Sequence, residues 1–186
     1  MITNKMELQK CLSLDSMNYE RRTSGWFRSL RNDFGVTPIS NQKYIWKYIK
    51  TLRYVELYTN RKRKWEIPFL VYYRHKLNYL SSKTGFQIPP NVVGPGMTIW
   101  HWGTIIINEN TRIGKNVTLN PLVVIGHKVP GGGCPVIGDD CFIGAGAIII
   151  GNIRIGNNVK IAPNAVVVKD VPDGTVVGGI PAKSIK

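Results

Sequence analysis

Residues 107–126 read INENTRIGKNVTLNPLVVIG, and residues 137–167 read IGDDCFIGAGAIIIGNIRIGNNVKIAPNAVV. Every sixth position of these stretches is aliphatic, namely Ile107, Ile113, Leu119, Ile125, Ile137, Ile143, Ile149, Ile155, Ile161 and Val167. Between the two stretches the same count by sixes passes through Gly131. An amphipathic helix repeats its apolar residues at threes and fours and an ordinary strand at twos, so a period of six fits neither. It indicates short strands joined by turns, each sending one side chain into a shared interior. The stretch therefore predicts a solenoid, here a parallel β-helix.

A second column of small or branched residues stands four places after the first. It contains Thr111, Val117, Val123, Val129, Pro135, Cys141, Ala147, Ile153, Val159, Ala165 and Val171, and it continues upstream through Ile105, Ile99 and Val93. The alternative is a chance pattern in an isoleucine-rich β-sandwich. We favour the solenoid because one register holds through so many repeats.

A histidine interrupts the first column. Counting back from Ile107 by sixes reaches His101, within Trp100-His101-Trp102-Gly103. An imidazole in an apolar column needs a hydrogen-bond partner, or the backbone must turn it outward. Because such a local inconsistency is typical of a functional site, we single out His101.

Two glycine-rich segments stand out farther along the repeat. Residues 127–135 read HKVPGGGCP, and three consecutive glycines predict a loop that leaves the coil. A glycine-rich backbone allows close approach of a phosphate or pantetheine group, and a loop without a ligand is the alternative. Gly144-Ala145-Gly146-Ala147 leaves one coil edge almost bare. Such an edge offers a groove to a slender ligand, and tight packing at a turn is a compatible explanation.

The chain before the repeat is predicted to be helical, which divides the protein into a helical region, 1–85, and a β-helix, 86–186. From Tyr44 to Tyr58, apolar residues recur at threes and fours. A second helix is expected after the basic run 61–64.

Pro68 suits the first turn of this second helix, and Gly85 is expected to end it. His75 within it has no partner visible in the sequence and is interpreted as structural. Residues 1–42 carry weak signals, apart from a turn expected near Gly35-Val36-Thr37-Pro38.

The formal net charge of +14 is concentrated in the first half of the chain. Residues 1–85 carry a net +11 and residues 86–186 a net +3. Such an excess suits nucleic acid, an anionic membrane face, a phosphate-bearing cofactor or simply a solvated helical surface. No base-reading module is visible, and aromatic residues at helical spacing, such as Trp46, Tyr48 and Tyr58, are more often core. We therefore expect no nucleic-acid partner.

Cysteine usage and hydropathy bear on the compartment. The three cysteines, Cys11, Cys134 and Cys141, are odd in number and lack metal-ligand spacing, which argues against a disulfide framework and a metal site. No apolar run is long enough to span a bilayer, and the first ten residues do not resemble a signal peptide. We expect no membrane partner and a cytoplasmic location.

The bare edge and the C-terminal motifs carry a family resemblance. Together with the hexapeptides, Gly144-Ala145-Gly146-Ala147, residues 166–172 (VVVKDVP) and Gly179-Ile180-Pro181-Ala182-Lys183 resemble the hexapeptide-repeat acyltransferases. Within them the chain is similar to the serine O-acetyltransferase branch, including relatives found in surface-polysaccharide gene clusters. The likeness covers residues 85–186 well and the preceding helices loosely.

The resemblance implies a mainly β protein, a left-handed parallel β-helix with an N-terminal α-helical region. It implies a homotrimer, or a dimer of trimers, with acetyl-CoA bound as co-substrate in clefts between subunits. His101 corresponds to the family's catalytic base. Cofactor contacts are implied for Gly144, Ala145, Gly146, Ala147, Ala162, Lys169 and Lys183. Acceptor contacts are expected for Asp33, Gln87, Trp102, His127 and Cys134, and no metal is implied.

The sequence departs from the family pattern at two places. Where an Asp usually orients the catalytic histidine, the coil before His101 has Gln87, which accepts a hydrogen bond but brings no charge. Where a second histidine usually precedes a proline, Cys134 precedes Pro135, and we expect His127, seven residues earlier, to substitute for it in space. The overall similarity favours serine, which we expect as the acceptor of acetyl transfer, and the missing histidine leaves a sugar or polysaccharide precursor as the alternative.

Rival mechanisms and classes remain at this point. The expected mechanism is direct transfer, in which His101 takes the proton of a hydroxyl that attacks the thioester, and the rival is Cys134 as a covalent acyl carrier. A non-catalytic scaffold is a rival class. A zinc-holding relative of carbonic anhydrase is disfavoured, because it needs three histidines and the solenoid has two.

Overall fold

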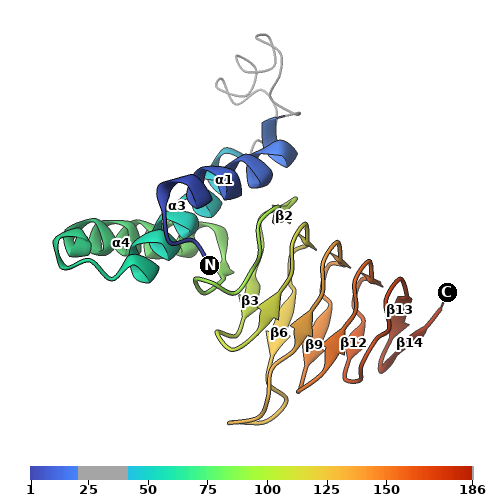
Figure 1. Cartoon of the computed structure of the whole chain (residues 1–186). Helices are drawn as coiled ribbons and strands as arrows, with labels where there is room; N and C mark the ends of the chain where they lie inside the picture. The colour runs from blue at the N-terminus through green and yellow to red at the C-terminus, as the bar shows by residue number, and fades with distance from the viewer. Residues whose placement is uncertain (21–41, 186) are drawn as a thin grey trace.

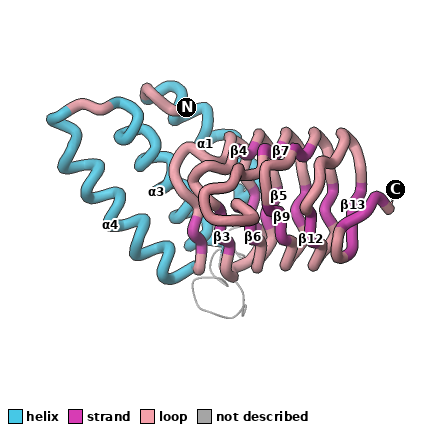
Figure 2. Tube along the Cα trace, turned by 90° about the horizontal axis from the view of Figure 1, so that it is seen from below, coloured by secondary structure: helices cyan, strands magenta, loops and turns pink. Residues whose placement is uncertain are grey.

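The structure is a computed structural model, and it describes residues 1–20 and 42–185. Within these ranges the helical elements are α1 (Lys5–Glu20), α3 (Gln42–Arg61), the 3-10 turn η1 (Lys64–Glu66) and α4 (Ile67–Thr84). The helices gather at one end of a prism of stacked coils, and the C-terminus lies at the other end (Figures 1 and 2).

The prism is built from short strands that pass in turn to three sheets. They are β1 (Phe86–Gln87), β2 (Thr98–Ile99), β3 (Ile105–Ile107), β4 (Arg112–Ile113), β5 (Thr118–Leu119), β6 (Val124–Gly126), β7 (Val136–Ile137), β8 (Phe142–Ile143), β9 (Ile148–Ile150), β10 (Arg154–Ile155), β11 (Lys160–Ile161), β12 (Val166–Val167), β13 (Val176–Gly179) and β14 (Ala182–Ser184). Sheet A has the order β1-β3-β6-β9-β12, sheet B β4-β7-β10 and sheet C β2-β5-β8-β11-β13-β14. The pairs are parallel except that of β13 with β14, and the fold is the predicted left-handed parallel β-helix.

The pairing register explains the hexapeptide period. Ile106 pairs with Val124, and Ile148 pairs with Val166, so one coil is 18 residues, or three hexapeptides. Val124 pairs with Ile148, 24 residues later, because that coil also contains the loop after β6. The loop adds six residues, and so the column register is the same before and after it.

Both predicted columns form the core. Side chains of the first column from Ile107 to Val167 are buried, as are Val93, Ile99 and Ile105 upstream. Two members counted into the columns lie outside the coil. Val129 is 57% exposed, and Gly131 is exposed at a positive φ, because both belong to the loop that leaves the coil.

The predicted helix signals in the first half are confirmed. Tyr44 to Tyr58 lie within α3, Pro68 stands in the first turn of α4, and Gly85 ends it in the left-handed conformation, with φ 79°. At that backbone angle glycine avoids the clash of a Cβ atom. His75 is exposed on α4.

Helix α1 was not predicted, because polar side chains occupy positions on its buried face. Asp15, Ser16 and Cys11 are buried beside Leu8 and Tyr19. A hydrophobicity pattern cannot show a helix whose packing face is half polar. The expected turn at 35–38 lies outside the described residues.

The polar face of α1 meets α3 and the first coil at a buried ionic cluster. The Arg53 side chain donates from Nε to Asp15 Oδ2 at 2.8 Å and from Nη1 to both oxygens of Glu56 at 3.2 and 3.1 Å. It also donates to the carbonyls of Val93 at 2.8 Å and Gly94 at 2.7 Å. The cluster therefore joins both helices to the backbone of the first coil.

The two carboxylates complete this junction. Asp15 Oδ1 accepts the backbone N–H groups of Gly96 at 2.7 Å and Met97 at 3.0 Å, and Glu56 Oε1 accepts that of Asn91 at 2.9 Å. Arg53 is 1% exposed, and this burial acts to lower the pKa of its guanidinium, but the charges of Glu56 and Asp15 outweigh it and the pKa is raised. Arg53 is therefore a fixed cation at the centre of the interface.

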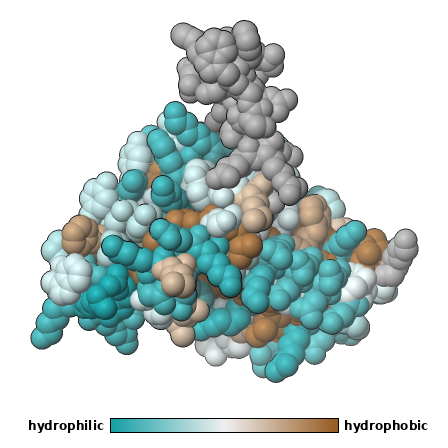
Figure 3. Space-filling model, turned by 45° about the horizontal axis from the view of Figure 1, so that its top comes forward, coloured by the Kyte–Doolittle hydropathy of each residue, from teal (hydrophilic) through white to brown (hydrophobic). Residues whose placement is uncertain are grey.

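Helices α3 and α4 are rich in aromatic and basic residues. Tyr48 is buried, and Tyr54 stacks on Tyr73 with 4.7 Å between ring centroids. Lys47 lies over the Tyr44 ring, 5.5 Å from its centroid. Hydrophilic residues cover much of the face seen in Figure 3, with smaller apolar patches among them.

Candidate active site

His101 lies in the turn that joins β2 to β3, and its side chain is exposed. The sequence left open whether the imidazole is buried with a hydrogen-bond partner or turned outward by the backbone, and the structure shows it turned outward. Gly103, two residues later, has φ 139°, and a Cβ atom there would lie 2.8 Å from Pro121 Cβ in the next coil. Glycine is therefore required for this turn to stack on its neighbour.

Helix α1 holds the strand that leads to His101. The Tyr19 hydroxyl accepts the backbone N–H of Ile99 at 2.8 Å and donates to the Ile99 carbonyl at 3.3 Å. Burial raises the pKa of this phenol, so the hydroxyl stays protonated and can serve as donor and acceptor. Sequence reasoning missed Tyr19, because its partner lies 80 residues away.

Trp102 lies beside His101 at the surface and is 37% exposed. Its ring makes an edge contact with Tyr44 of α3, with 5.7 Å between centroids. The helical region thus contributes an aromatic side chain next to the candidate base. Gln87, the other predicted neighbour, is exposed on β1 of sheet A, where it pairs with Ile106.

The turns between sheets C and A stack into one long edge, which we call the C-to-A edge and define by residues 100–104, 120–123, 144–147 and 162–165. Gly146 donates its N–H to the Pro121 carbonyl at 2.9 Å, and Asn164 donates its own to the Ala145 carbonyl at 2.8 Å. This edge carries His101, then, two coils further along, Gly144, Ala145, Gly146 and Ala147, and Ala162 in the coil after that.

Coil packing by itself accounts for part of the bare edge. A Cβ atom on Gly144 would lie 2.6 Å from Pro163 N and 2.7 Å from the Ile161 carbonyl oxygen. Ala147 is fully buried in the core, so it presents no surface to an external ligand. Ala145 is exposed and Gly146 half-buried, which leaves these two to form the outer surface of the edge.

The turns between sheets A and B form a second edge, which we call the A-to-B edge and define by residues 108–111, 127–135, 151–153 and 168–170. Here Asn108 contacts two predicted site residues. Its Nδ2 lies 3.1 Å from Nδ1 of His127, and its Oδ1 accepts the thiol of Cys134 at 3.3 Å. The predicted residue Lys169 is exposed on the same edge. Sequence reasoning missed Asn108, which no motif distinguishes from other turn asparagines.

The two edges do not meet within one chain. His101 precedes β3, whereas His127 follows β6, and these two strands are parallel neighbours in sheet A. Strands rise about 3.3 Å per residue, so a three-residue strand separates the two turns by roughly 10 Å. Lys183, on β14, pairs with Gly178 at the end of sheet C. Asp33 lies outside the described residues.

The three cysteines are free thiols, and all three are buried. Cys134 is buried, and its S–H is engaged by Asn108. Burial raises the pKa of Cys11 to about 12 and also raises the pKa of Cys141. A nucleophilic cysteine needs an accessible thiolate, so these surroundings disfavour the covalent acyl-carrier mechanism.

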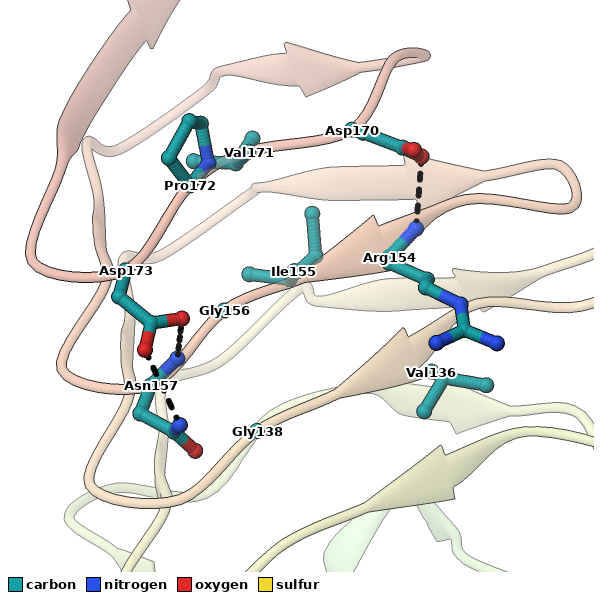
Figure 4. A pocket seen from close by; sticks show the side chains of 10 residues that line it. All are labelled: Val136, Gly138, Arg154, Ile155, Gly156, Asn157, Asp170, Val171, Pro172 and Asp173. Atoms are coloured by element: carbon teal, nitrogen blue, oxygen red, sulfur yellow. Dashed lines mark hydrogen bonds between the residues drawn. The ribbon is translucent and has the colours of Figure 1, made fainter.

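A groove of about 450 Å³ lies elsewhere, over β7 and β10 of sheet B (Figure 4). Its carboxylates serve the backbone: Asp170 accepts the N–H of Arg154 at 2.8 Å, and Asp173 accepts that of Asn157 at 2.9 Å. The residues lining it include none of the predicted site residues. We therefore interpret its polar groups as coil-to-coil contacts.

Neither a metal-ligand cluster nor a membrane-spanning helix is found in the described ranges, 1–20 and 42–185. No group of three or more His, Cys, Asp or Glu side chains in them is arranged to hold a metal ion. No helix in them is both long and apolar enough to cross a bilayer.

Known proteins resemble both the repeat and the whole chain. Residues 134–169 match the family model of the bacterial transferase hexapeptide (six repeats). A curated serine acetyltransferase of Helicobacter pylori (strain 26695) is 40% identical over 71 residues, which are 37% of this chain and 42% of that protein. Serine acetyltransferase 5 of Arabidopsis thaliana is 40% identical over 65 residues, 34% of this chain and 21% of that protein. The matches thus span less than half the length of these curated relatives.

Solved structures extend the likeness over almost the entire chain. The serine acetyltransferase of Neisseria gonorrhoeae, crystallised in complex with serine, superimposes with a TM-score of 0.68 and 31% identity. The match covers 98% of this chain and 70% of that one. The soybean serine acetyltransferase apoenzyme gives a TM-score of 0.73 at 26% identity, covering 96% of this chain and 69% of that one. The chain therefore belongs to the serine acetyltransferase family of hexapeptide-repeat proteins.

Proposed function

We propose that this protein is an acetyl-CoA-dependent serine O-acetyltransferase, which converts L-serine and acetyl-CoA to O-acetylserine and CoA. The observation that carries the proposal is the match across 98% of the chain to a serine acetyltransferase crystallised with serine. It is supported by the position of His101, whose ring is exposed on the edge that also carries Ala145 and Gly146.

The mechanism is direct transfer with His101 as general base. The imidazole takes the proton of the acceptor hydroxyl while its oxygen attacks the thioester carbonyl. The tetrahedral intermediate then expels the thiolate of CoA, which receives the proton from the imidazolium. General-base help of this kind contributes about 10²–10⁴-fold, and the oxyanion needs backbone N–H donors from a neighbouring turn.

Assembly supplies the second half of the site. Because His101 and His127 lie at opposite ends of sheet A, both reach one substrate only if the C-to-A edge of one chain faces the A-to-B edge of another. A head-to-tail contact of this type closes into a ring, and we propose a homotrimer with three shared clefts, which can pair into a dimer of trimers. We place it in the cytoplasm, where Cys11, Cys134 and Cys141 stay as free thiols.

The acceptor has a second candidate, a sugar or polysaccharide hydroxyl. Serine requires an acid for its ammonium group. Among the described acids, Asp15 and Glu56 are engaged by Arg53, and Glu109 lies on the A-to-B edge, so it reaches a substrate at His101 only from the facing chain. A sugar hydroxyl needs no such acid, so the positions of these acids favour a sugar as the second candidate acceptor.

One assay tests the activity and the acceptor together. CoA release from acetyl-CoA is measured with serine, homoserine and sugar acceptors, for the wild type, His101→Ala and the control His75→Ala. We expect turnover with serine, a loss of about 10²-fold or more in kcat/KM for His101→Ala with CoA binding retained, and normal activity for the exposed control. Full activity of His101→Ala contradicts the mechanism, and turnover with a sugar but not with serine replaces the acceptor.

A mixed assembly tests the shared cleft. Subunits carrying His101→Ala and subunits carrying His127→Gln are co-expressed with different tags, and the mixed species is purified. If one site takes His101 and His127 from different chains, a mixed trimer regains at least one intact site, and its activity exceeds that of both parents. A monomer by light scattering, or no recovery in the mixed species, contradicts the assembly.

A further inference from the structure

The cluster of Asn108, His127 and Cys134 fixes where the proton of His127 sits. The backbone N–H of Asn110 donates to Asn108 Oδ1 at 2.9 Å. A backbone N–H group can only donate, so the atom that it meets must be the amide oxygen. The Cys134 thiol points at the same oxygen, at 3.3 Å. The orientation of the Asn108 amide is thus determined by two independent donors.

The opposite end of that amide faces the imidazole. Asn108 Nδ2 lies 3.1 Å from Nδ1 of His127. An amide –NH₂ has no lone pair to offer, so Nδ1 must be the acceptor in this bond. In a neutral imidazole with an unprotonated Nδ1, the proton is on Nε2. The contact therefore selects one tautomer.

The remaining ring nitrogen is available to a ligand. His127 is exposed, and no residue in the described ranges forms a hydrogen bond with its Nε2. A protonated Nε2 donates a hydrogen bond and cannot take a proton from a substrate hydroxyl. His101 differs, because no described residue fixes its tautomer by a hydrogen bond.

We propose that Asn108 is a positioning residue that holds His127 as the Nε2–H tautomer, so that His127 donates a hydrogen bond to a carbonyl or carboxylate oxygen of the acceptor substrate. The inference rests on the proposed acetyl transfer, and it adds to the acceptor contact expected of His127 the residue that sets its tautomer. His101 removes the proton of the acceptor, and His127 of the facing chain holds an oxygen of the same molecule. Cys134 orients Asn108 and takes no part in the chemistry.

The tautomer is measurable without any substrate. The chain contains three histidines, so ¹⁵N-histidine labelling of the full chain gives three imidazole signals, which His75→Gln, His101→Gln and His127→Gln assign. In the neutral ring of His127 we expect Nε2 to be protonated and Nδ1 unprotonated. A wild type with the proton on Nδ1, or with the mixture found for the exposed His75, overturns the proposal.

Asn108→Asp is the decisive variant. A carboxylate still accepts the Asn110 N–H and the Cys134 thiol, but it can only accept from Nδ1 of His127, which reverses the tautomer. We expect Nδ1 to be protonated in this variant. The KM for the acceptor should rise by about tenfold to a hundredfold, the range that a hydrogen bond involving a charged group supplies, with a smaller change in kcat.

Asn110→Asp is the matched control. It adds the same charge to the same turn and keeps the backbone N–H that orients Asn108, so the tautomer stays unchanged and KM changes far less. An unchanged KM in Asn108→Asp despite a reversed tautomer overturns the donor role. If the wild type transfers acetyl to no acceptor, the proposed function fails, while the tautomer is still decided by the spectrum.

Discussion

Replacing Arg53 by methionine tests whether the buried ionic cluster joins the helices to the coil. The substitution leaves the carboxylates of Asp15 and Glu56 buried without their cation, and it leaves the carbonyls of Val93 and Gly94 without their donors. Asp15 and Glu56 are 0% and 2% exposed, so solvent cannot replace the lost contacts.

The expected loss of stability is large. Removing one partner of a buried ion pair costs about 3–5 kcal/mol, because the remaining charge is uncompensated. With an m value of about 2 kcal/mol/M in urea, this lowers the unfolding midpoint by roughly 2 M. Arg53→Lys keeps the charge but not the two-sided guanidinium contacts, so its loss should be intermediate.

Urea unfolding followed by circular dichroism, at one fixed protein concentration, measures these changes. Arg74→Met, on the exposed side of α4, removes the same charge from the surface and should stay within about 0.5 kcal/mol of the wild type. Arg53→Lys gives a measurable value even if Arg53→Met does not fold. A free energy of unfolding for Arg53→Met within about 1 kcal/mol of the wild type refutes the reasoning.

Three further predictions concern the coil and the buried phenol and thiol. Tyr19→Phe leaves the N–H of Ile99 unsatisfied two residues before His101, which should cost about 1–3 kcal/mol and lower kcat; unchanged thermal unfolding and kcat would contradict this role. Gly144→Ala should lower stability by about 1–3 kcal/mol because its Cβ meets backbone atoms of the next coil, whereas Ala145→Ser, at an exposed position, should be neutral by thermal unfolding. Because burial raises the pKa of Cys11 to about 12, its native thiol binds a proton that the unfolded thiol has released above its ordinary pKa of about 9. The stabilising effect of this protonated thiol is therefore complete below about pH 9 and is lost towards pH 12. Over this range the free energy of unfolding should fall less steeply with pH in Cys11→Ala than in the wild type. Equal slopes in the two proteins would contradict the prediction.

The candidate site was visible in the sequence only in part. His101 broke an apolar column, and that anomaly identified it without a structure. Gly144 and Gly146 stood out by composition, although coil packing explains the need for a glycine at Gly144. Asn108 and Tyr19 gave no signal, because each acts through hydrogen bonds with residues distant in sequence.

The sequence by itself determined the β-helix. Each coil repeats the same local environment, so the aliphatic residues at Ile107, Ile113 and their successors report the fold once every hexapeptide. The loop adds six residues, which is one full period, so the register is the same on both sides of it. For this reason its residues Val129 and Gly131 were counted as members of the core columns.

Only the tertiary structure decided how the helices join the coil and where the second histidine lies. Asp15 and Arg53 are 38 residues apart, and Asp15 reaches Gly96 over 81 residues. His127 meets Asn108 across 19 residues, at the end of sheet A opposite to His101. Each of these contacts is formed once by one polar side chain, and among the described residues none of them follows the period of six. A periodic pattern cannot report them, and only the stacking of the coils brings their atoms within hydrogen-bond distance.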